Sequence, residues 1–282
     1  METISNPQEL QNLCLMLRSE GKKISLVPTM GYFHEGHLSL MDAARKRCDV
    51  LIVSLFVNPT QFGENEDLEA YPHDLGRDSL LAEEHGVDIL FTPVRDDMYF
   101  DDHGTWVEVP DLASNLCGQS RPIHFRGVAT VVTKLFMTAQ PHVALFGQKD
   151  WQQLAIIKRI VRDLNIPVDV QGHEIVREES GLAMSSRNVY LTEEEKSVAP
   201  NIQKGLQKMR AQVAAGESDV AKLKSDLIEF YAETVPMGKI DYIEIVHPDN
   251  INILKSVGDS ALCAVALQLG NARLIDNLLI KV

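Results

Sequence analysis

The amino-acid sequence predicts an α/β protein with a doubly wound parallel sheet, followed by a second, smaller α+β domain. Strand-like and helix-like segments alternate through the first part of the chain, as in proteins built on a parallel sheet. The run VLIVSLFV at 50–57 is apolar without alternation, which is typical of a parallel strand buried on both faces. After about Val176, two helix-like segments precede three strand-like ones. The 282 residues correspond to about two domains, which we place at 1–176 and 177–282.

The first part of the chain contains the elements expected of the parallel sheet. The first helix begins after Asn6, a residue type that favours helix N-caps, with Pro7 at the first helical position, and it ends at Gly21. The other elements follow from the period of the apolar residues and from the turn signals between them. The expected strands cover 24–27, 50–57, 87–91, 143–146 and 167–170, and the expected helices cover 38–48, 74–85, 128–139 and 151–164.

The second part of the chain has a different pattern. Thr192 and Glu195 have the spacing of a capping box, which predicts one long helix that continues to about Ala215. A second helix is expected over 219–234. Three strands are then expected, at 241–246, 261–267 and 273–279. Two helices followed by three strands indicate a small α+β domain.

The balance of charges argues against nucleic acid as a partner. The chain has 40 acidic and 27 basic side chains, a formal net charge of −13, whereas a phosphodiester backbone attracts a basic surface. The four cysteines show no C-x-x-C spacing, the N-terminus has no signal-peptide pattern, and no apolar run reaches the roughly 18 residues of a membrane span. We therefore expect a cytoplasmic protein with reduced cysteines, no nucleic-acid or membrane partner, and a few local donors for any anionic ligand.

The segment VPTMGYFHEGHLSL, at 27–40, lies between the first long strand and its helix. Ligands of doubly wound sheets bind at the carboxyl ends of the strands, and this segment occupies such an end. Gly31 and Gly36 have the spacing of a Walker A loop, but His37 and Leu38 stand where that loop needs its lysine and its hydroxyl residue. A zincin helix is excluded as well, because the sequence H-E-G-H does not match H-E-x-x-H.

The third interpretation of this segment is an H-x-G-H motif. In such a motif His34, His37 and the first amides of a helix converge on a phosphate group, because a helix N-terminus is electropositive and imidazole nitrogens can donate hydrogen bonds. The alternative is a histidine-bearing turn between strand and helix that binds nothing. Short motifs often occur by chance, so these residues alone leave both interpretations open.

Two further segments could contribute to a phosphate site. MSSRN, at 184–188, offers two hydroxyls and a guanidinium, although a Ser/Arg linker in solvent would look the same. FGQKD, at 146–150, places Lys149 where a strand ends and the next helix begins. There Asp150 and Gln153 also fit a capping box, which would explain both residues without a ligand.

These three segments, in this order, resemble the pantoate–β-alanine ligases, a family within the HxGH nucleotidyltransferase superfamily. The resemblance covers nearly the whole chain. It includes the blocks SLFVNPTQF at 54–62, AYP at 70–72, RPIHFRGVATVV at 121–132, GLAMSSRN at 181–188 and ARLIDN at 272–277. Four polar residues lie in matching blocks but receive no individual role: Asn58, Tyr71, Arg121 and His124.

The resemblance implies the ATP-dependent ligation of pantoate and β-alanine to pantothenate. Pantoate and ATP would first give an enzyme-bound pantoyl adenylate and pyrophosphate, and the amine of β-alanine would then displace AMP. It also implies Mg²⁺ together with ATP, a Rossmann-like N-terminal domain, a smaller C-terminal lid and a homodimer.

The resemblance also implies roles for individual residues. His37 would be the proton donor, and the other catalytic residues would be His34, Lys149, Ser185 and Arg187. The residues expected at ATP are Met30, Gly31, Tyr32, Phe33, His34, Glu35, Gly36, His37, Gly147, Gln148, Lys149, Asp150, Val176, Met184, Ser185, Ser186 and Arg187. Those expected at pantoate are Gln61, Gln153, Val131 and Val132, with Gln61 also at β-alanine and Asp78 at the metal ion.

Two positions depart from the family pattern, and two other functions remain open. Gln148 stands where many relatives have an acidic residue, and Arg77 stands where some relatives have a second acid before Asp78.

The first rival function is that of another adenylyl or cytidylyl transferase with the same motif. The second is that of a nucleotide-binding module without catalytic activity.

Overall fold

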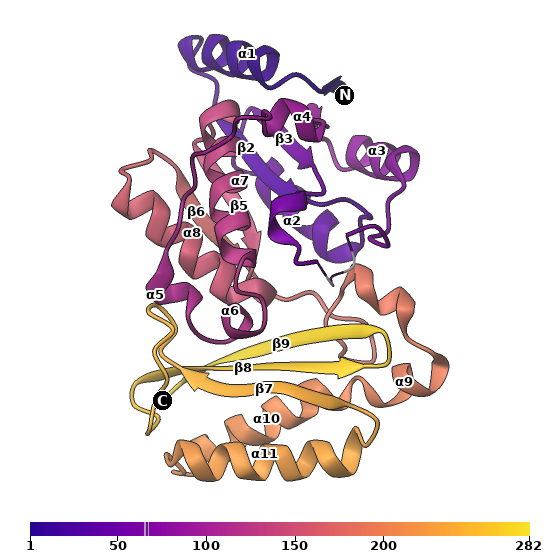
Figure 1. The fold of residues 1–282 in the computed structure, drawn as a ribbon, viewed down its shortest axis with the longest axis vertical. Coiled ribbons are helices and arrows are strands. Elements are labelled where there is room, and N and C mark those ends of the chain that lie inside the picture. Colours follow the sequence, from indigo (N-terminus) through magenta and orange to yellow (C-terminus); the bar gives the residue numbers. More distant parts are fainter. Residues whose placement is uncertain (65, 67) are drawn as a thin grey trace. The chain divides into compact units, whose positions relative to one another are not determined.

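The computed structural model describes residues 1–64, 66 and 68–282 and separates into two compact units (Figure 1). The N-terminal unit consists of Met1–Pro110, Arg121–Gln148 and Ile156–Glu174, and the C-terminal unit consists of Asp111–Ser120, Lys149–Ala155 and Ile175–Val282. Two short segments of the C-terminal unit thus come from the part of the chain that otherwise forms the N-terminal unit, where no local sequence pattern indicates them. The domain boundary between residues 176 and 177 stays a prediction.

A six-stranded parallel sheet forms the N-terminal unit, which confirms the predicted doubly wound architecture. The strands lie in the order β1, β4, β3, β2, β5, β6. Their bounds are Glu2–Ile4 for β1, Ile24–Thr29 for β2, Val50–Leu55 for β3, Ile89–Phe91 for β4, Val143–Gly147 for β5 and Asp169–His173 for β6. The short strand β1 is missing from the predicted elements, because three residues are too few to show a period.

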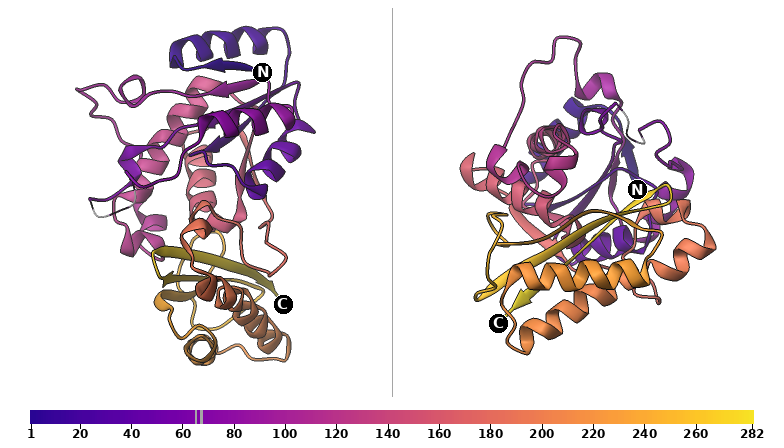
Figure 2. Two further views of the ribbon diagram at one scale, coloured as in Figure 1. Left: turned by 90° about the vertical axis from the view of Figure 1, so that its right-hand side faces the viewer. Right: turned by 60° about the horizontal axis from the view of Figure 1, so that its bottom comes forward.

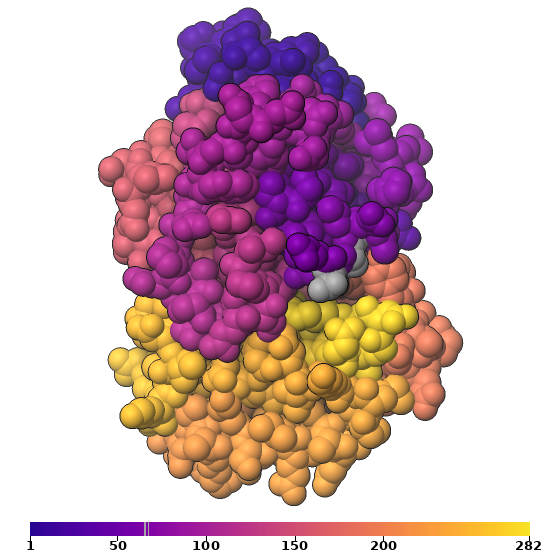
Figure 3. Space-filling model, in the orientation of Figure 1, coloured from indigo at the N-terminus to yellow at the C-terminus, as the bar shows by residue number. Residues whose placement is uncertain are grey.

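The helices of this unit are α1 (Pro7–Ser19), α2 (Glu35–Arg45), α3 (Leu75–Glu84), α4 (Arg95–Met98), α7 (His124–Ala139) and, from Ile156 on, α8 (Trp151–Asp163). On one face of the sheet, Val27, Val53 and Leu90 share a buried core with α2 and α3. The neighbouring row of strand residues, with Leu26 and Ile52, points to the other face and is buried as well, and α7 packs against β2. The helix α1 lies at one end of this unit (Figure 1), where the indigo atoms of the N-terminal residues gather in Figure 3. Within the described ranges, no helix has both the length and the apolar character needed to cross a membrane.

The order of the strands reverses between β2 and β5, which are neighbours in the sheet, with Ser25 paired to Val143. From here the chain proceeds outward through β3 and β4 on one side and through β6 on the other. Ligands of open α/β sheets bind at the carboxyl ends of the strands, at such a reversal. The fold therefore places the segments that follow Thr29 and Gly147 where a ligand site is expected.

A three-stranded antiparallel sheet and two long helices form the C-terminal unit, which confirms the predicted α+β fold. The strands are β7 (Lys239–Val246), β8 (Ser260–Leu269) and β9 (Ala272–Lys281), and the helices are α5 (Pro110–Ala113), α6 (Cys117–Ser120), α9 (Glu193–Val198), α10 (Asn201–Ala214) and α11 (Val220–Thr234). α10 and α11 lie side by side against one face of this sheet (Figure 1, Figure 2). Leu206, Leu227 and Val265, from α10, α11 and β8, belong to one buried core.

The prediction of one long helix after Thr192 is wrong, because the structure divides it at Pro200. The capping box of Thr192 and Glu195 is present, but the helix that it opens, α9, ends at Val198. Pro200 then stands at the N-cap of α10, with φ −60°. Proline has no N–H to donate to the carbonyl one turn earlier, and its ring clashes with that carbonyl, so the two helices remain separate.

Candidate active site

The segment after β2 makes a tight turn before α2 begins. Gly31 has φ +90° and Tyr32 has φ +53°, both in the left-handed region. A Cβ at Gly31 would lie 3.1 Å from Asp78 Oδ2 and 3.1 Å from a methyl carbon of Leu55. Both the backbone conformation and the available space therefore favour glycine at this position. The turn delivers the chain to His34, which is the N-cap of α2.

Asp78, on α3, holds this turn. Its side chain is buried, and its two oxygens accept hydrogen bonds from the N–H groups of Tyr32 (2.6 Å) and Phe33 (2.8 Å). Burial raises the pKa of this carboxyl, and the two N–H donors and Arg77 oppose the effect. Arg77 also donates to the Phe33 carbonyl (2.9 Å), and its guanidinium lies over the Tyr32 ring. The arginine that departs from the family pattern therefore supports the same turn.

The role of Asp78 as a metal ligand stays a prediction. Among the residues that the structure describes, no group of three His, Cys, Asp or Glu side chains could hold a metal ion. Both oxygens of Asp78 accept from the backbone, so a metal ion bound there would compete with the two N–H donors.

We expect Asp78→Asn to lower the free energy of unfolding by about 1–3 kcal/mol, which is the cost of leaving a buried polar group unsatisfied. The amide keeps one acceptor oxygen but turns its NH2 group toward one of the two backbone N–H groups. Denaturant unfolding measures the change. Asp96→Asn is the control, because the Asp96 carboxylate is 86 % exposed. If the two variants are equally stable, Asp78 does not hold the turn.

His34 and His37 cap the first turn of α2 reciprocally. The Gly36 N–H donates to Nδ1 of His34 (3.1 Å), and the His34 N–H donates to Nδ1 of His37 (3.4 Å). A ring nitrogen that accepts carries no proton, so each neutral imidazole has its proton on Nε2. The two ring centres are 4.1 Å apart. The N-terminus of α2 thus combines two imidazole N–H donors with its own positive end, which suits a phosphate group.

Gln61 belongs to the 3-10 turn η1 (Pro59–Gln61) that follows β3, and its side-chain amide has a fixed orientation. Asn58 Nδ2 donates to Oε1 of Gln61 (3.1 Å), and Gln61 Nε2 donates to Sδ of Met30 (3.0 Å). Gln61 and Asn58 are both buried. The structure therefore brings a residue predicted for pantoate into contact with one predicted for ATP.

The helix α7 packs against this turn, and Gly127 makes the close approach possible. A Cβ at Gly127 would lie 2.5 Å from the Thr60 carbonyl oxygen and 2.6 Å from Cα of Gln61, closer than van der Waals contact allows. Val131 and Val132, further along α7, are buried. Their contact with pantoate stays a prediction.

Arg121 and His124 fix the same turn through its backbone. Arg121 forms an ion pair with Glu66, and its Nε donates to Glu66 Oε1 (2.7 Å). Burial by itself raises the pKa of Glu66, but the hydrogen bond and charge of Arg121 outweigh it, so the pKa is lowered. His124 Nε2 accepts from Arg121 (3.2 Å), so its Nδ1–H donates to the Gln61 carbonyl (2.9 Å). These two block residues thus support the position of Gln61.

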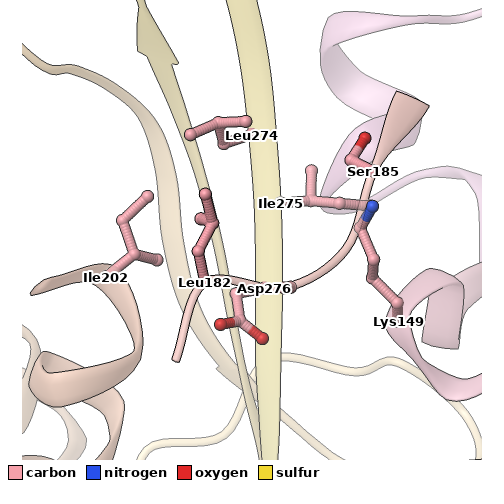
Figure 4. A pocket seen from close by; sticks show the side chains of 8 residues that line it. Lys149, Leu182, Ser185, Ile202, Leu274, Ile275 and Asp276 are labelled. Atoms are coloured by element: carbon pink, nitrogen blue, oxygen red, sulfur yellow. The ribbon is translucent and has the colours of Figure 1, made fainter. Parts of the chain in front are cut away.

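Lys149 brings a partly buried ammonium group to the C-terminal unit. Its Nζ donates to the Met184 carbonyl (2.9 Å), and no carboxylate of the described residues lies within ion-pair distance of it. Burial lowers the pKa of this ammonium, Asp150 opposes the effect and Arg187 adds to it. In Figure 4 the amine points toward the segment that carries Ser185, and both residues line one small pocket. A cation without a paired carboxylate favours an anionic ligand.

The MSSRN segment follows a short hairpin that the Met184 N–H closes by donating to the Val176 carbonyl (3.0 Å). Ser185 is then the N-cap of the 3-10 turn η3 (Ser186–Tyr190), and its hydroxyl oxygen accepts from the Arg187 N–H (3.3 Å). Because this oxygen accepts from the backbone, its proton can be donated to a ligand.

The capping box expected from Asp150 and Gln153 does not describe this part of the structure. Gly147 ends β5, and the 3-10 turn η2 (Gln148–Asp150) runs directly into α8. Asp150 is thus inside a helical segment, whereas an N-cap residue has an extended backbone. Gln153 lies in the first turn of α8.

The structure brings several predicted site residues together within each unit. These are His34 with His37, Met30 with Gln61, and Lys149 with Met184 and Ser185. Gln61 and Gln153 belong to different units, so their joint contact with one pantoate molecule stays a prediction.

Asp276 and Asn277 are supporting residues that lie in the ARLIDN block, to which the sequence patterns assigned no role. They follow one another on β9 and are both buried. Two successive polar residues inside the apolar run LIDNLLI, at 274–280, are the signal that could have indicated them, because burying polar groups costs free energy unless they are hydrogen-bonded.

A doubly wound sheet that carries two imidazole donors at a helix N-terminus beside its strand reversal defines a nucleotide-binding class of α/β protein. Comparison with protein families narrows this class, because residues 2–279 match the family model "Pantoate-beta-alanine ligase". The chain belongs to the pantoate–β-alanine ligase family and is therefore a ligase.

Individual relatives agree with this family. The chain is 89 % identical to the pantothenate synthetase of Maridesulfovibrio salexigens over 100 % of both chains. It is 58 % identical to that of Nitratidesulfovibrio vulgaris (strain Miyazaki F) over 99 % of both. Pantothenate synthetase from Thermus thermophilus matches the structure with TM-score 0.92, 44 % identity and 99 % of both chains. Pantoate–β-alanine ligase from Francisella tularensis, complexed with beta-gamma ATP and β-alanine, matches with TM-score 0.79 and 32 % identity over 99 % of this chain and 97 % of that chain.

Proposed function

We propose that this chain joins pantoate and β-alanine to pantothenate through a pantoyl adenylate, with ATP as the second substrate of the first step. The two relatives named pantothenate synthetase that are 89 % and 58 % identical to the chain support the overall reaction. The Francisella tularensis relative, complexed with beta-gamma ATP and β-alanine, supports these two substrates. Pyrophosphate is released in the first step and AMP in the second.

The histidine pair at the N-terminus of α2 is the observation that carries the adenylation step. When the pantoate carboxylate attacks the α-phosphorus of ATP, negative charge grows on the phosphate oxygens. Donors already aimed at these oxygens lower the barrier. His34 and His37 supply two Nε2–H donors of this kind, and we assign proton donation to His37.

The C-terminal unit supplies the remaining positive charge. Lys149, Ser185 and Arg187 would hold the other phosphates and the departing pyrophosphate, because the ammonium is partly buried without a paired carboxylate. We assign the adenosine part of the site to Met30, Gly31, Gly147, Asp150, Val176 and Met184.

Pantoate needs hydrogen-bonding amides beside apolar surface, because it combines hydroxyls and a carboxylate with a gem-dimethyl centre. Gln61 offers an amide of fixed orientation, and Gln153, Val131 and Val132 would complete this part of the site. In the second step the amine of β-alanine, next to Gln61, attacks the acyl carbon. The bond between the acyl carbon and the phosphate oxygen breaks, AMP leaves with the electron pair, and the amine loses a proton. Proximity of the two reactants accounts for much of the rate of such a step.

Gly127→Ala tests how strongly the reaction depends on the position of Gln61. The new methyl group has no room against the turn, so we expect a loss of about 1–3 kcal/mol in unfolding free energy and a higher KM for pantoate. Thermal unfolding and steady-state kinetics measure the two effects. Gly258→Ala is the control, because a Cβ there meets nothing within 4 Å. If both variants keep the KM of the original chain, the close approach of α7 does not set this part of the site.

We infer that Mg²⁺ accompanies ATP and takes most of its oxygen ligands from phosphates and water, as this small hard cation commonly does. Asp78 is the side chain that we predict near it, and its present hydrogen bonds to the turn make it a weak candidate for direct ligation. We further propose that the chain forms a homodimer in the cytoplasm. Light scattering would measure the mass of this dimer.

Exchange of labelled pyrophosphate into ATP tests the adenylate. With ATP, Mg²⁺ and pantoate but without β-alanine, we expect exchange that depends on pantoate. Pantothenate formation without such exchange would contradict the intermediate. Exchange that needs an unrelated acid would support a different adenylyl transferase, and nucleotide binding without any turnover would support a non-catalytic module.

A further inference from the structure

We infer that Asp276 and Asn277, neighbours on β9, are positioning residues for the proposed phosphate site. They act through Lys149 and through the segment that carries Ser185 and Arg187, without touching substrate. The inference rests on the proposed function for the chemical role of these groups. The contacts that support it all lie within the C-terminal unit.

Asp276 ties the hairpin before MSSRN to β9. Its carboxylate, 4 % exposed, accepts two hydrogen bonds from the Arg177 guanidinium, 2.7 Å to Oδ2 and 2.9 Å to Oδ1. Nη1 of Arg177 also donates to the Gly181 carbonyl (3.1 Å), at the turn of the hairpin. A bidentate pair of this kind fixes both the distance and the orientation of its partners. The hairpin therefore has a defined place against β9.

Through the hairpin, the pair of Asp276 and Arg177 also affects the position of the Lys149 ammonium group. Ala183 pairs with Arg177 as an antiparallel bridge, so the next residue, Met184, takes its position from the residue that Asp276 holds. The Met184 carbonyl accepts from Lys149 Nζ (2.9 Å). Loosening the pair of Asp276 and Arg177 therefore moves an acceptor that orients the amine, together with the start of MSSRN.

Asn277 holds the backbone of Lys149 itself. Its Nδ2 donates to the Lys149 carbonyl (2.8 Å), and its own N–H donates to Asp276 Oδ1 (2.8 Å). Successive residues of a strand point to opposite faces, so Asp276 and Asn277 reach different neighbours from one short stretch of β9. The strand β9 thus fixes the position of the Lys149 main chain. Through Arg177 it also fixes the position of the Met184 carbonyl, which accepts from the Lys149 side chain.

Asp276→Asn and Asn277→Ala test the inference through the kinetics of pyrophosphate exchange. We expect kcat/KM for ATP to fall by about 10- to 100-fold in each, because a misplacement of about 1 Å can cost about 10²-fold. We expect the KM for pantoate to stay unchanged. Arg177→Lys keeps the charge but loses the bidentate geometry, so it should fall between Asp276→Asn and the original chain.

Glu244→Gln is the matched control. It removes the ion pair of Glu244 with Lys224 (2.8 Å), which is also partly buried and in the same unit but contacts neither Lys149 nor MSSRN. We expect this variant to keep its kcat/KM for ATP. If Asp276→Asn and Asn277→Ala match it, β9 has no positioning role.

Combination with Lys149→Ala separates positioning from general stability. If Asp276 acts through Lys149, Asp276→Asn will add little to the loss caused by Lys149→Ala, whereas independent effects multiply. Multiplying losses would overturn the inference. Should Asp276→Asn fail to fold, Asn277→Ala decides alone, since it removes a side-chain contact without unpairing a charge. A wild-type chain that shows no exchange would instead contradict the proposed function, so the two failures differ.

Discussion

Replacing His37 by alanine is expected to lower kcat for pantothenate formation by about 10²–10³-fold, the loss typical of one preorganised hydrogen-bond donor in an active site. Pyrophosphate exchange should fall in parallel, because the donor acts in the adenylation step. Circular dichroism should show an intact fold, since His37 is on the first turn of α2 and outside the central core. An unchanged rate would remove His37 from the mechanism.

Two conservative replacements separate donation by His37 from its role in the cap of α2. His37→Asn places an oxygen near the position of Nδ1, so it can still accept from the His34 N–H, but it has no donor near Nε2. His37→Gln places an NH2 group near Nε2 and has no acceptor near Nδ1. We expect the asparagine variant to be about as slow as the alanine variant and the glutamine variant to be faster. The opposite order would show that His37 acts by capping the helix.

The second large effect is expected for Lys149→Met. Removal of the ammonium should lower kcat/KM for ATP by about 10²–10³-fold, because a charge aimed at the phosphates is lost. The melting temperature should not fall, since methionine fills similar space without the cost of burying a charge that has no carboxylate partner. Lys224→Met is the control: it breaks the pair with Glu244, so activity should persist while stability falls by about 0.2–1 kcal/mol. A large loss of stability in Lys149→Met would show that Lys149 mainly supports the fold.

The lowered pKa of Lys149 also has a measurable dependence on pH. Its pKa in the folded chain lies below 10.5, its ordinary value, because burial disfavours the charged form. Between these two pKa values the unfolded chain binds more protons than the folded one, so unfolding free energy rises with pH in this window. At pH values below the pKa of Lys149 in the folded chain, the full free-energy cost of burying its charge is present. Urea unfolding from neutral pH upward should therefore show that Lys149→Met loses its stability advantage as pH rises, and a constant difference would contradict this.

The architecture was predictable because it depends on patterns that extend over many residues. The alternation of segments and the unbroken apolar run at 50–57 predict a parallel sheet, and the strands β2 to β6 are all present. The break at Pro200 was predictable in principle, since proline interrupts a helix wherever it occurs inside one. Strand β1 was not, because its three residues pair with β4 through tertiary contacts that leave no local period.

The candidate site was only partly predictable. The histidines and Lys149 stand in short motifs at strand ends, where the fold places ligands. Their supports are different, because Asp78, Arg177 and Asp276 act through partners far away in the chain. A carboxylate that binds two backbone amides leaves no spacing rule in the sequence, so its role emerges only when the partners are brought together.

The interleaving of the two units has a consequence for synthesis on the ribosome. The N-terminal sheet can close once β6 has emerged, since all its strands are then available. The pieces 111–120 and 149–155, however, belong with strands that are made last. Until β7 and the residues after it are made, Cys117 lacks Tyr242, whose hydroxyl lies 3.2 Å from the Cys117 thiol in the folded chain, and Trp151 lacks the Pro248 carbonyl. During synthesis, residues 111–120 and 149–155 therefore remain undocked until the C-terminal strands are made. A chain released before that point would lack the strands on which these two segments pack.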